Sequence, residues 1–218
     1  MKIRLHGYDH DHMNRSLPAI PKELGQLLPA SLHDSCSTQK YGKGDRLFVT
    51  GDKPAYMFFV ASGEVVLERL GLQGAPVILQ RTRHGFVGEA SLQSARYHCD
   101  GRAIAASEIA RVPIREIRAA LESDPPFATR WIGMLNQEVK RLRMQCERLS
   151  LHKVQDRLLH LLDTEGMNGK YPIGAGLKSL AGELGVTHEA LYRCVAEMEK
   201  KSLLRRDEGC LSLLVPRE

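Results

Sequence analysis

The 218-residue sequence predicts an α+β fold made of a small β-barrel, one long helix and a C-terminal helical domain. Three observations lead to this prediction. Glycines interrupt short apolar segments across residues 38–112, which is typical of a jelly-roll barrel. Apolar residues recur at heptad spacing over residues 127–150, and two short amphipathic helical patterns follow between residues 177 and 204. We accordingly divide the chain into an N-terminal arm (1–30), a barrel domain (31–124), a long helix (125–150) and a C-terminal domain (151–218).

The composition argues against a membrane-spanning, secreted or disulfide-rich protein. An apolar share of 43% is normal for a globular chain, and no run of eighteen apolar residues exists to span a bilayer. The first residues lack the apolar core of a signal peptide, so we expect a cytoplasmic protein with no membrane partner. The five cysteines are widely spaced and include no Cys-x-x-Cys pair, which favours reduced thiols over a disulfide framework or a zinc site.

The N-terminal arm shows little periodicity but is rich in histidine. His6, His10 and His12 alternate with Asp9 and Asp11. A His-x-His flanked by carboxylates could bind a transition metal, and a mobile polar arm is the other interpretation.

The barrel region reads as about eight short strands with turns at glycines. Residues 56–61 form one apolar segment, which Ser62 and Gly63 close, and residues 65–67 and 77–79 form two more. A short helix is expected over residues 114–121, and it must end before Pro125 and Pro126, because proline cannot sit in a helix interior.

The long helix carries a regular apolar seam. Its apolar residues are spaced alternately by four and three, which is the a/d pattern of a coiled coil. A helix packed on its own domain is one explanation, but we favour a homodimer that forms along this seam. The positions concerned are Ala128, Ile132, Leu135, Val139, Leu142, Cys146 and Leu149.

Residues 177–204 predict a helix-turn-helix. Gly185 supplies the turn between the two helices, and Thr187 is a suitable N-cap for the second one. The second helix buries Leu191, Val195 and Met198 and leaves polar side chains outside, namely His188, Glu189, Tyr192 and Arg193. The first turns of such a helix can enter the major groove of DNA, although a plain helical hairpin would have the same periodicity.

The C-terminal domain has no net charge, since residues 151–218 contain ten basic and ten acidic residues. DNA binding must therefore use a few well-placed groups, with Lys178 and the outer face of the second helix as candidates. A two-stranded wing is expected from residues 203–204 and 211–215. Arg205 and Arg206 at its turn could contact phosphate or could simply be solvated.

The order of barrel, seam helix and winged helix-turn-helix resembles the CRP/FNR superfamily of bacterial transcription factors. The resemblance rests on residues 43–45 and 51–52, on the Ser-Gly-Glu-Val at 62–65, on the Phe-Val-Gly-Glu at 86–89 and on the two helical patterns. It implies a homodimeric regulator of transcription that binds double-stranded DNA and contacts RNA polymerase.

The resemblance also implies how DNA is read. The family uses a Glu and an Arg four positions apart, which match Glu189 and Arg193. A Glu accepts from cytosine N4 and an Arg donates to guanine O6 and N7, so an inverted repeat with TGA-like half-sites is expected. An i, i+4 ion pair between these two side chains is the structural alternative. His188 and Tyr192 fall on the family's variable contacts.

The resemblance makes the barrel similar to a cyclic-nucleotide-binding domain. Gly88 and Glu89 match the Gly-Glu that meets the ribose, but the Arg-Ser pair that meets the phosphate falls on Tyr97 and His98. Arg96 or Arg102 would have to take its place. We therefore expect standard cyclic AMP binding to be lost, which leaves a new effector or none.

The cysteines and histidines decide which other sensing or catalytic chemistries are expected. The arm has no cysteine cluster before Cys36, so no iron–sulfur cluster is expected, whereas a metal- or thiol-responsive regulator with Cys99 or Cys146 stays open. An enzyme of the cupin kind needs a His-x-His inside the barrel, and the barrel offers only His84 and His98. We therefore predict no catalytic site.

Overall fold

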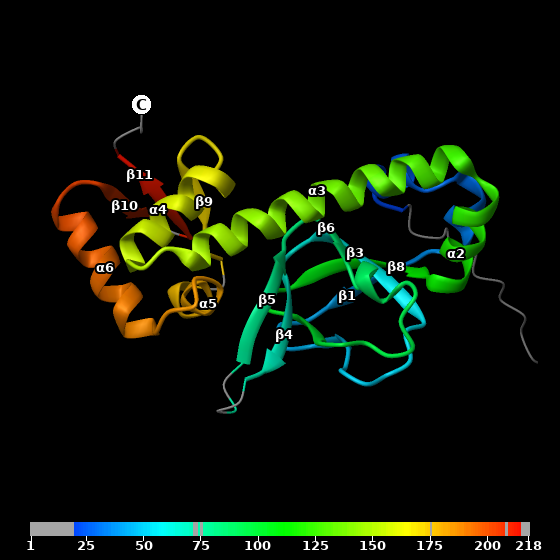
Figure 1. Cartoon of the computed structure of the whole chain (residues 1–218), viewed down its shortest axis with the longest axis horizontal. Helices are drawn as coiled ribbons and strands as arrows, with labels where there is room; N and C mark the ends of the chain where they lie inside the picture. The colour runs from blue at the N-terminus through cyan, green and yellow to red at the C-terminus, as the bar shows by residue number, and fades with distance from the viewer. Residues whose placement is uncertain (1–19, 72–73, 75, 175, 208, 215–218) are drawn as a thin grey trace, which may run out of the picture.

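The computed structural model describes residues 20–214 except for 72–73, 75, 175 and 208. The histidines of the arm, and with them both interpretations of this segment, lie outside the described residues. Within the described part of the chain, the order of elements is a β-barrel domain, a long helix and a small C-terminal domain, as Figure 1 shows.

The barrel is a jelly roll of two four-stranded antiparallel sheets, which confirms the prediction. Their strand orders are β1-β8-β3-β6 and β2-β7-β4-β5. Phe48, Phe58, Val65 and Ile109 are among the residues that fill the space between the sheets. The strands are β1 (Ser37–Tyr41), β2 (Arg46–Phe48), β3 (Tyr56–Ser62), β4 (Val65–Leu70), β5 (Pro76–Thr82), β6 (Gly85–Val87), β7 (Asp100–Ala103) and β8 (Ser107–Pro113).

The turn between β3 and β4 shows why a glycine is needed there. Gly63 has a φ of +88°, and a Cβ at this position would collide with the Ser107 hydroxyl. The Ser107 hydroxyl accepts a hydrogen bond from the Glu64 backbone N–H at 3.0 Å. Any other residue at position 63 would push the β3–β4 turn away from the start of β8.

The region predicted as an arm is partly helical. A short helix α1 (Lys22–Leu27) and a 3₁₀ helix η1 (Ala30–Ser35) precede β1. Leu24, Leu28 and Leu32 are buried there, in one cluster with the helix α2 (Ile114–Ser123) and the start of the long helix. The predicted arm boundary at residue 30 therefore differs from the structure, because three leucines spaced by four bind this segment to a distant part of the chain.

The long helix α3 (Pro125–Ser150) runs along the barrel to the C-terminal domain (Figure 1). The Asp124 carboxylate caps it by accepting from the Phe127 N–H at 2.9 Å. Phe127, Trp131 and Arg148 are buried on one side of the helix. Four seam positions are 39–58% exposed, namely Ile132, Val139, Leu142 and Leu149, and Cys146 is exposed as well. Leu135, the remaining predicted interface residue, is partly buried against the barrel-side cluster.

The C-terminal domain is a winged helix-turn-helix. It contains α4 (Val154–Glu165), β9 (Lys170–Pro172), α5 (Gly176–Glu183), α6 (His188–Lys200), β10 (Leu204–Asp207) and β11 (Cys210–Leu213). Gly185 adopts a φ of +63° in the turn between α5 and α6, as expected. The three strands pair in the order β10-β11-β9, so the wing has a third strand, β9, that the sequence pattern did not predict.

Candidate nucleic-acid interface and effector region

The start of α6 presents polar side chains to the outside. The Thr187 hydroxyl accepts from the Ala190 N–H at 3.2 Å and so begins the helix. Leu191, Val195 and Met198 are buried in the domain core, which orients the opposite face outward. On that face Glu189, Tyr192 and Arg193 are exposed, while His188 is half-buried with its ring edge against Tyr192.

The two predicted base-reading residues are not engaged with each other. Within the described residues, no ion pair joins Glu189 to Arg193. Hydrogen bonds from its own backbone N–H and from Thr187 lower the pKa of Glu189, so this carboxylate is an acceptor at neutral pH. Both side chains are therefore available to a partner.

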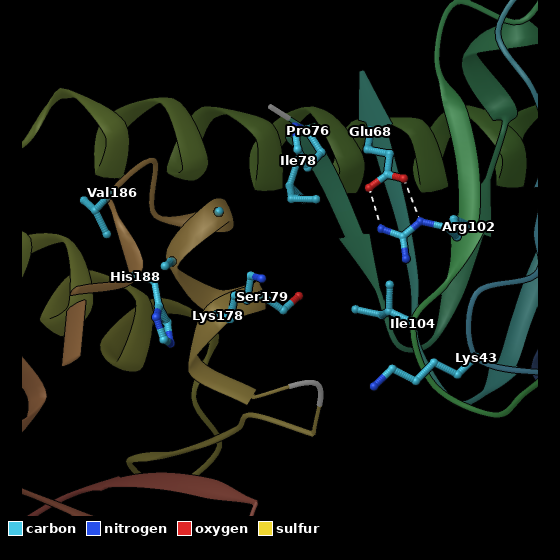
Figure 2. Close-up of a pocket in the computed structure, with 12 residues that line it drawn as sticks. Lys43, Glu68, Pro76, Ile78, Arg102, Ile104, Lys178, Ser179, Val186 and His188 are labelled. Carbon is cyan, nitrogen blue, oxygen red and sulfur yellow. Dashed lines mark hydrogen bonds and ion pairs between the residues drawn. The ribbon is translucent and has the colours of Figure 1, made fainter. Parts of the chain in front are cut away.

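Lys178 and His188 line a cavity between the C-terminal domain and the barrel. The cavity measures about 420 Å³, and Lys43, Arg102 and Ile104 line its barrel side. Figure 2 shows the two sets of side chains facing each other across it. The structure thus places two of the predicted DNA-binding residues and one predicted effector residue around the same space.

The wing turn is polar and exposed. Arg205 pairs with Asp207 at 2.8 Å, and both side chains are at least 40% exposed. The Arg206 N–H donates to the Glu199 carboxylate at 3.1 Å, which ties the wing to α6. The wing is thereby held beside the C-terminal end of α6.

The Gly-Glu motif of the barrel lies at a turn that faces α3. Gly88 has a φ of +87° and begins the 3₁₀ helix η2 (Glu89–Ser91). Burial raises the pKa of Glu89, and Glu138 and Arg141 of α3 are its charged neighbours. Among the described residues the buried Glu89 Oε2 has no hydrogen-bond partner.

The other predicted effector residues do not converge on one site. Tyr97 is buried in the barrel, where its ring stacks on Phe48 at 4.1 Å between centroids. His98 is exposed. The Arg96 guanidinium donates to the Gly51 carbonyl at 2.6 Å.

Arg102 is held by a carboxylate. Its guanidinium donates two hydrogen bonds to Glu68, at 2.6 and 2.7 Å. Arg96 and Arg102 are thus both engaged by protein groups, and the Tyr97 ring, which the sequence resemblance matched to the family's phosphate-binding arginine, is buried in the barrel. The described residues therefore do not fit a cyclic nucleotide held in the standard manner.

A buried ionic cluster lies where the barrel, α3 and the C-terminal domain meet. It was not predicted, because its members are far apart in sequence and each reads as an ordinary charged residue. Arg81 and Arg148 have side chains that are only 4% and 1% exposed. We call the set the interdomain cluster; it consists of Glu64, Arg81, Arg83, Arg148, Glu165 and Glu183.

Two cysteines should be chemically inert. Burial raises the pKa of both Cys36 and Cys99 to about 11, and the thiolate is the reactive form. We expect neither to be alkylated by iodoacetamide at pH 8 in the native protein, and both to react once urea unfolds it. Peptide mass mapping checks this. Rapid native labelling of Cys99 would contradict the burial and would revive it as a thiol sensor.

Comparison with solved structures defines the class of fold. FixK2 from Bradyrhizobium japonicum is similar with 17% identity and a TM-score of 0.71, and the match covers 82% of this chain and 92% of that one. A CRP-family transcriptional regulator from Thermus thermophilus has 14% identity and a TM-score of 0.65, with 81% and 92% of the two chains covered. The c-di-GMP responsive global regulator CLP from Xanthomonas campestris has 21% identity and a TM-score of 0.63, with 83% and 95% covered. The chain therefore has the fold of the CRP/FNR regulators, as the sequence predicted.

The match to a protein-family model covers only the barrel region of the chain. Residues 38–124 match the model of the cyclic nucleotide-binding domain family, so this segment is a domain of that family. No curated protein matches the chain. None of the helices in the described part of the chain is long and apolar enough to cross a membrane.

Proposed function

We propose that this chain is a homodimeric, sequence-specific DNA-binding regulator of transcription of the CRP/FNR type. The observation that carries the proposal is that Glu189 and Arg193 are exposed on the first turns of a helix whose opposite face is buried, with no ion pair between them among the described residues. The similar solved structures support it, since their names describe transcriptional regulators. A regulator of this kind acts on the chromosome, so we place it in the bacterial cytoplasm, in contact with RNA polymerase.

The reading of DNA follows from the chemistry of these two side chains. An Arg donates bidentately to guanine O6 and N7, and a Glu accepts from cytosine N4. Thr187, His188 and Tyr192 stand at the start of α6 with them, and Lys178 of α5 lines a cavity together with His188. All four are proposed to contact phosphates or flanking bases. Two copies related by a two-fold axis would read an inverted repeat of TGA-like half-sites about 34 Å apart.

Dimerisation is proposed along α3. The four large apolar side chains Ile132, Val139, Leu142 and Leu149 are exposed on one stripe of a single chain. A second copy of the same helix would cover them through the heptad geometry that their spacing implies. Cys146 lies on the same stripe and Leu135 flanks it.

The effector domain is proposed to have lost standard cyclic AMP binding. Tyr97 packs in the barrel interior, and Arg96 and Arg102 are held by Gly51 and Glu68. The alternatives are an effector-free regulator with a degenerate barrel, or one that responds to a metal or a thiol oxidant. No catalytic role is proposed: His84 lies edge-on against Phe59 at the surface, and His98 is exposed, so neither points to a cupin-like centre.

The test is fluorescence anisotropy of the full chain on a duplex with inverted TGA-type half-sites, with a scrambled duplex as control, at physiological salt. We expect preferential binding to the first duplex without any additive, and no change on adding cyclic AMP. Equal binding to both duplexes would contradict sequence-specific reading. Binding that requires cyclic AMP would contradict the loss of the nucleotide site.

A further inference from the structure

The interdomain cluster is centred on Arg81 of β5. Its guanidinium forms ion pairs with Glu64 of the barrel and, at 2.6 Å, with Glu183 of α5. It also donates a hydrogen bond to the Ser179 hydroxyl, one turn earlier on α5. A single buried side chain therefore joins the barrel to the first helix of the helix-turn-helix.

Arg83, which lies just beyond the end of β5, makes a second connection. Arg83 donates to the Pro172 carbonyl at 2.9 Å and lies over the Tyr171 ring at 4.7 Å. It also pairs with Glu64 at 3.1 Å. Arg81 and Arg83 thus hold α5 and β9 from the same edge of the barrel.

The long helix enters the cluster from the other side. Arg148 pairs with Glu165 of α4 and lies 3.9 Å from Glu183. The Tyr171 hydroxyl donates to Glu183 at 3.2 Å. Glu183 is therefore the point at which the barrel, α3 and the C-terminal domain all meet.

Helix α5 lies close to the Ile78 side chain of β5 beside these ion pairs. A Cβ at Gly182 would lie 3.3 Å from the Ile78 side chain of β5. Glycine inside a helix costs about 1 kcal/mol relative to alanine, so a residue type that suits the helix poorly stands where α5 approaches β5. The small residue allows Glu183 and Ser179 to come within reach of Arg81.

The position of α5 fixes that of α6. The Val186 N–H donates to the Ala181 carbonyl at 3.0 Å across the turn, and Leu180, Leu184 and Leu191 pack in one core. Whatever orients α5 on the barrel therefore orients the start of α6. In this arrangement Glu189, Tyr192 and Arg193 are all exposed.

We propose that Arg81 is a positioning residue, which holds α5 through Glu183 and Ser179 and thereby fixes the DNA-reading end of α6 relative to the barrel. The inference rests on the proposed function. A buried ion pair suits this role, because the loss of Arg81 would leave the buried Glu183 carboxylate without this partner and would disfavour the contact. The cluster is thus a route by which the barrel controls DNA binding without touching DNA.

The test replaces Arg81 with methionine in the full-length protein, with Arg69→Met as matched control. Arg69 is an exposed arginine on the adjacent strand β4, so its loss removes the same charge from the same sheet. We expect Arg81→Met to bind the inverted-repeat duplex about tenfold more weakly or worse, because only a fraction of molecules holds the domain in place. Arg69→Met should stay within about twofold of the wild type.

A double-mutant cycle with Glu183→Gln separates positioning from general damage. If both residues act through one contact, the double variant binds no more weakly than the weaker single variant. Amide hydrogen exchange should show lost protection in α5 and β9, with β3 and β8 unchanged. Fully additive losses, unchanged affinity, or tighter DNA binding would each overturn the proposal.

Gly182→Leu guards against misfolding of the arginine variant. It crowds Ile78 and weakens the same contact while keeping both Arg81 and Glu183 in the chain, so a loss of affinity in the same direction is expected. If the wild-type protein itself binds no duplex specifically, the proposed function fails. Amide hydrogen exchange alone then tests whether Arg81 holds α5 on the barrel. Lost protection in α5 of the Arg81→Met variant supports this contact, and unchanged protection overturns it.

Discussion

Replacing Arg193 with alanine should abolish preferential binding to the inverted repeat while leaving weak non-specific binding intact. Arg193 is exposed on α6 and, among the described residues, forms no ion pair with Glu189, so the folded domain loses little when it is removed. A bidentate contact to guanine is worth ~1–3 kcal/mol of discrimination, which is roughly a five- to 150-fold loss for each half-site. Anisotropy on specific and scrambled duplexes measures it.

Two further variants show whether the guanidinium fork or only the charge matters at this position. Arg193→Lys keeps the charge and lacks the fork, so it should lose specificity almost as completely and keep the salt dependence. Lys200→Ala, at the far end of α6, removes a charge about 10 Å along the helix from Arg193 and should change specificity little. Unchanged discrimination in Arg193→Ala would show that α6 is not the reading helix.

Replacing Leu142 with aspartate should convert the protein to monomers. Leu142 is 43% exposed in the single chain and lies in the middle of the seam between Val139 and Cys146. In a two-fold coiled coil the two introduced carboxylates would face each other in an apolar interface, which costs several kcal/mol and weakens association about a thousandfold or more. Sedimentation velocity at micromolar concentration measures the mass.

The matched control for this substitution is Asn136→Asp. Asn136 is exposed on the same helix but off the seam, and the charge change is the same. It should remain dimeric, and circular dichroism should show both variants folded. A Leu142→Asp protein that sediments as a dimer would refute the seam as the interface, and the exposed stripe on α3 would then need another partner.

Local sequence pattern was sufficient for the elements whose stability is local. The heptad spacing from Ile132 to Leu149 predicted both the helix and its exposed stripe, because neighbours at three and four residues share a face whatever surrounds them. The N-cap at Thr187 and the left-handed turn at Gly185 were predicted for the same reason: each depends on one residue type and its immediate neighbours.

Elements that depend on distant partners were missed. Helix α1 has six residues and forms against α2 and α3, which start about 90 residues later. Strand β9 has three residues and exists through its pairing with β11. Strand β9 is too short to show a period of its own, and the spacing by four of Leu24, Leu28 and Leu32 is only a weak local signal for α1, because three positions do not define a helix without the partners they pack against.

The sequence by itself determined the barrel, the seam helix, the winged helix-turn-helix and the outward face that carries Glu189 and Arg193. Only the tertiary structure decided that Tyr97 fills the barrel, that Glu68 holds Arg102, and that Arg81 joins Glu183 across the domains. The physical reason is that a charged residue is expected to lie at the solvent-exposed surface when only the sequence is known. Whether it is instead buried and paired depends on a partner that folding brings from far along the chain.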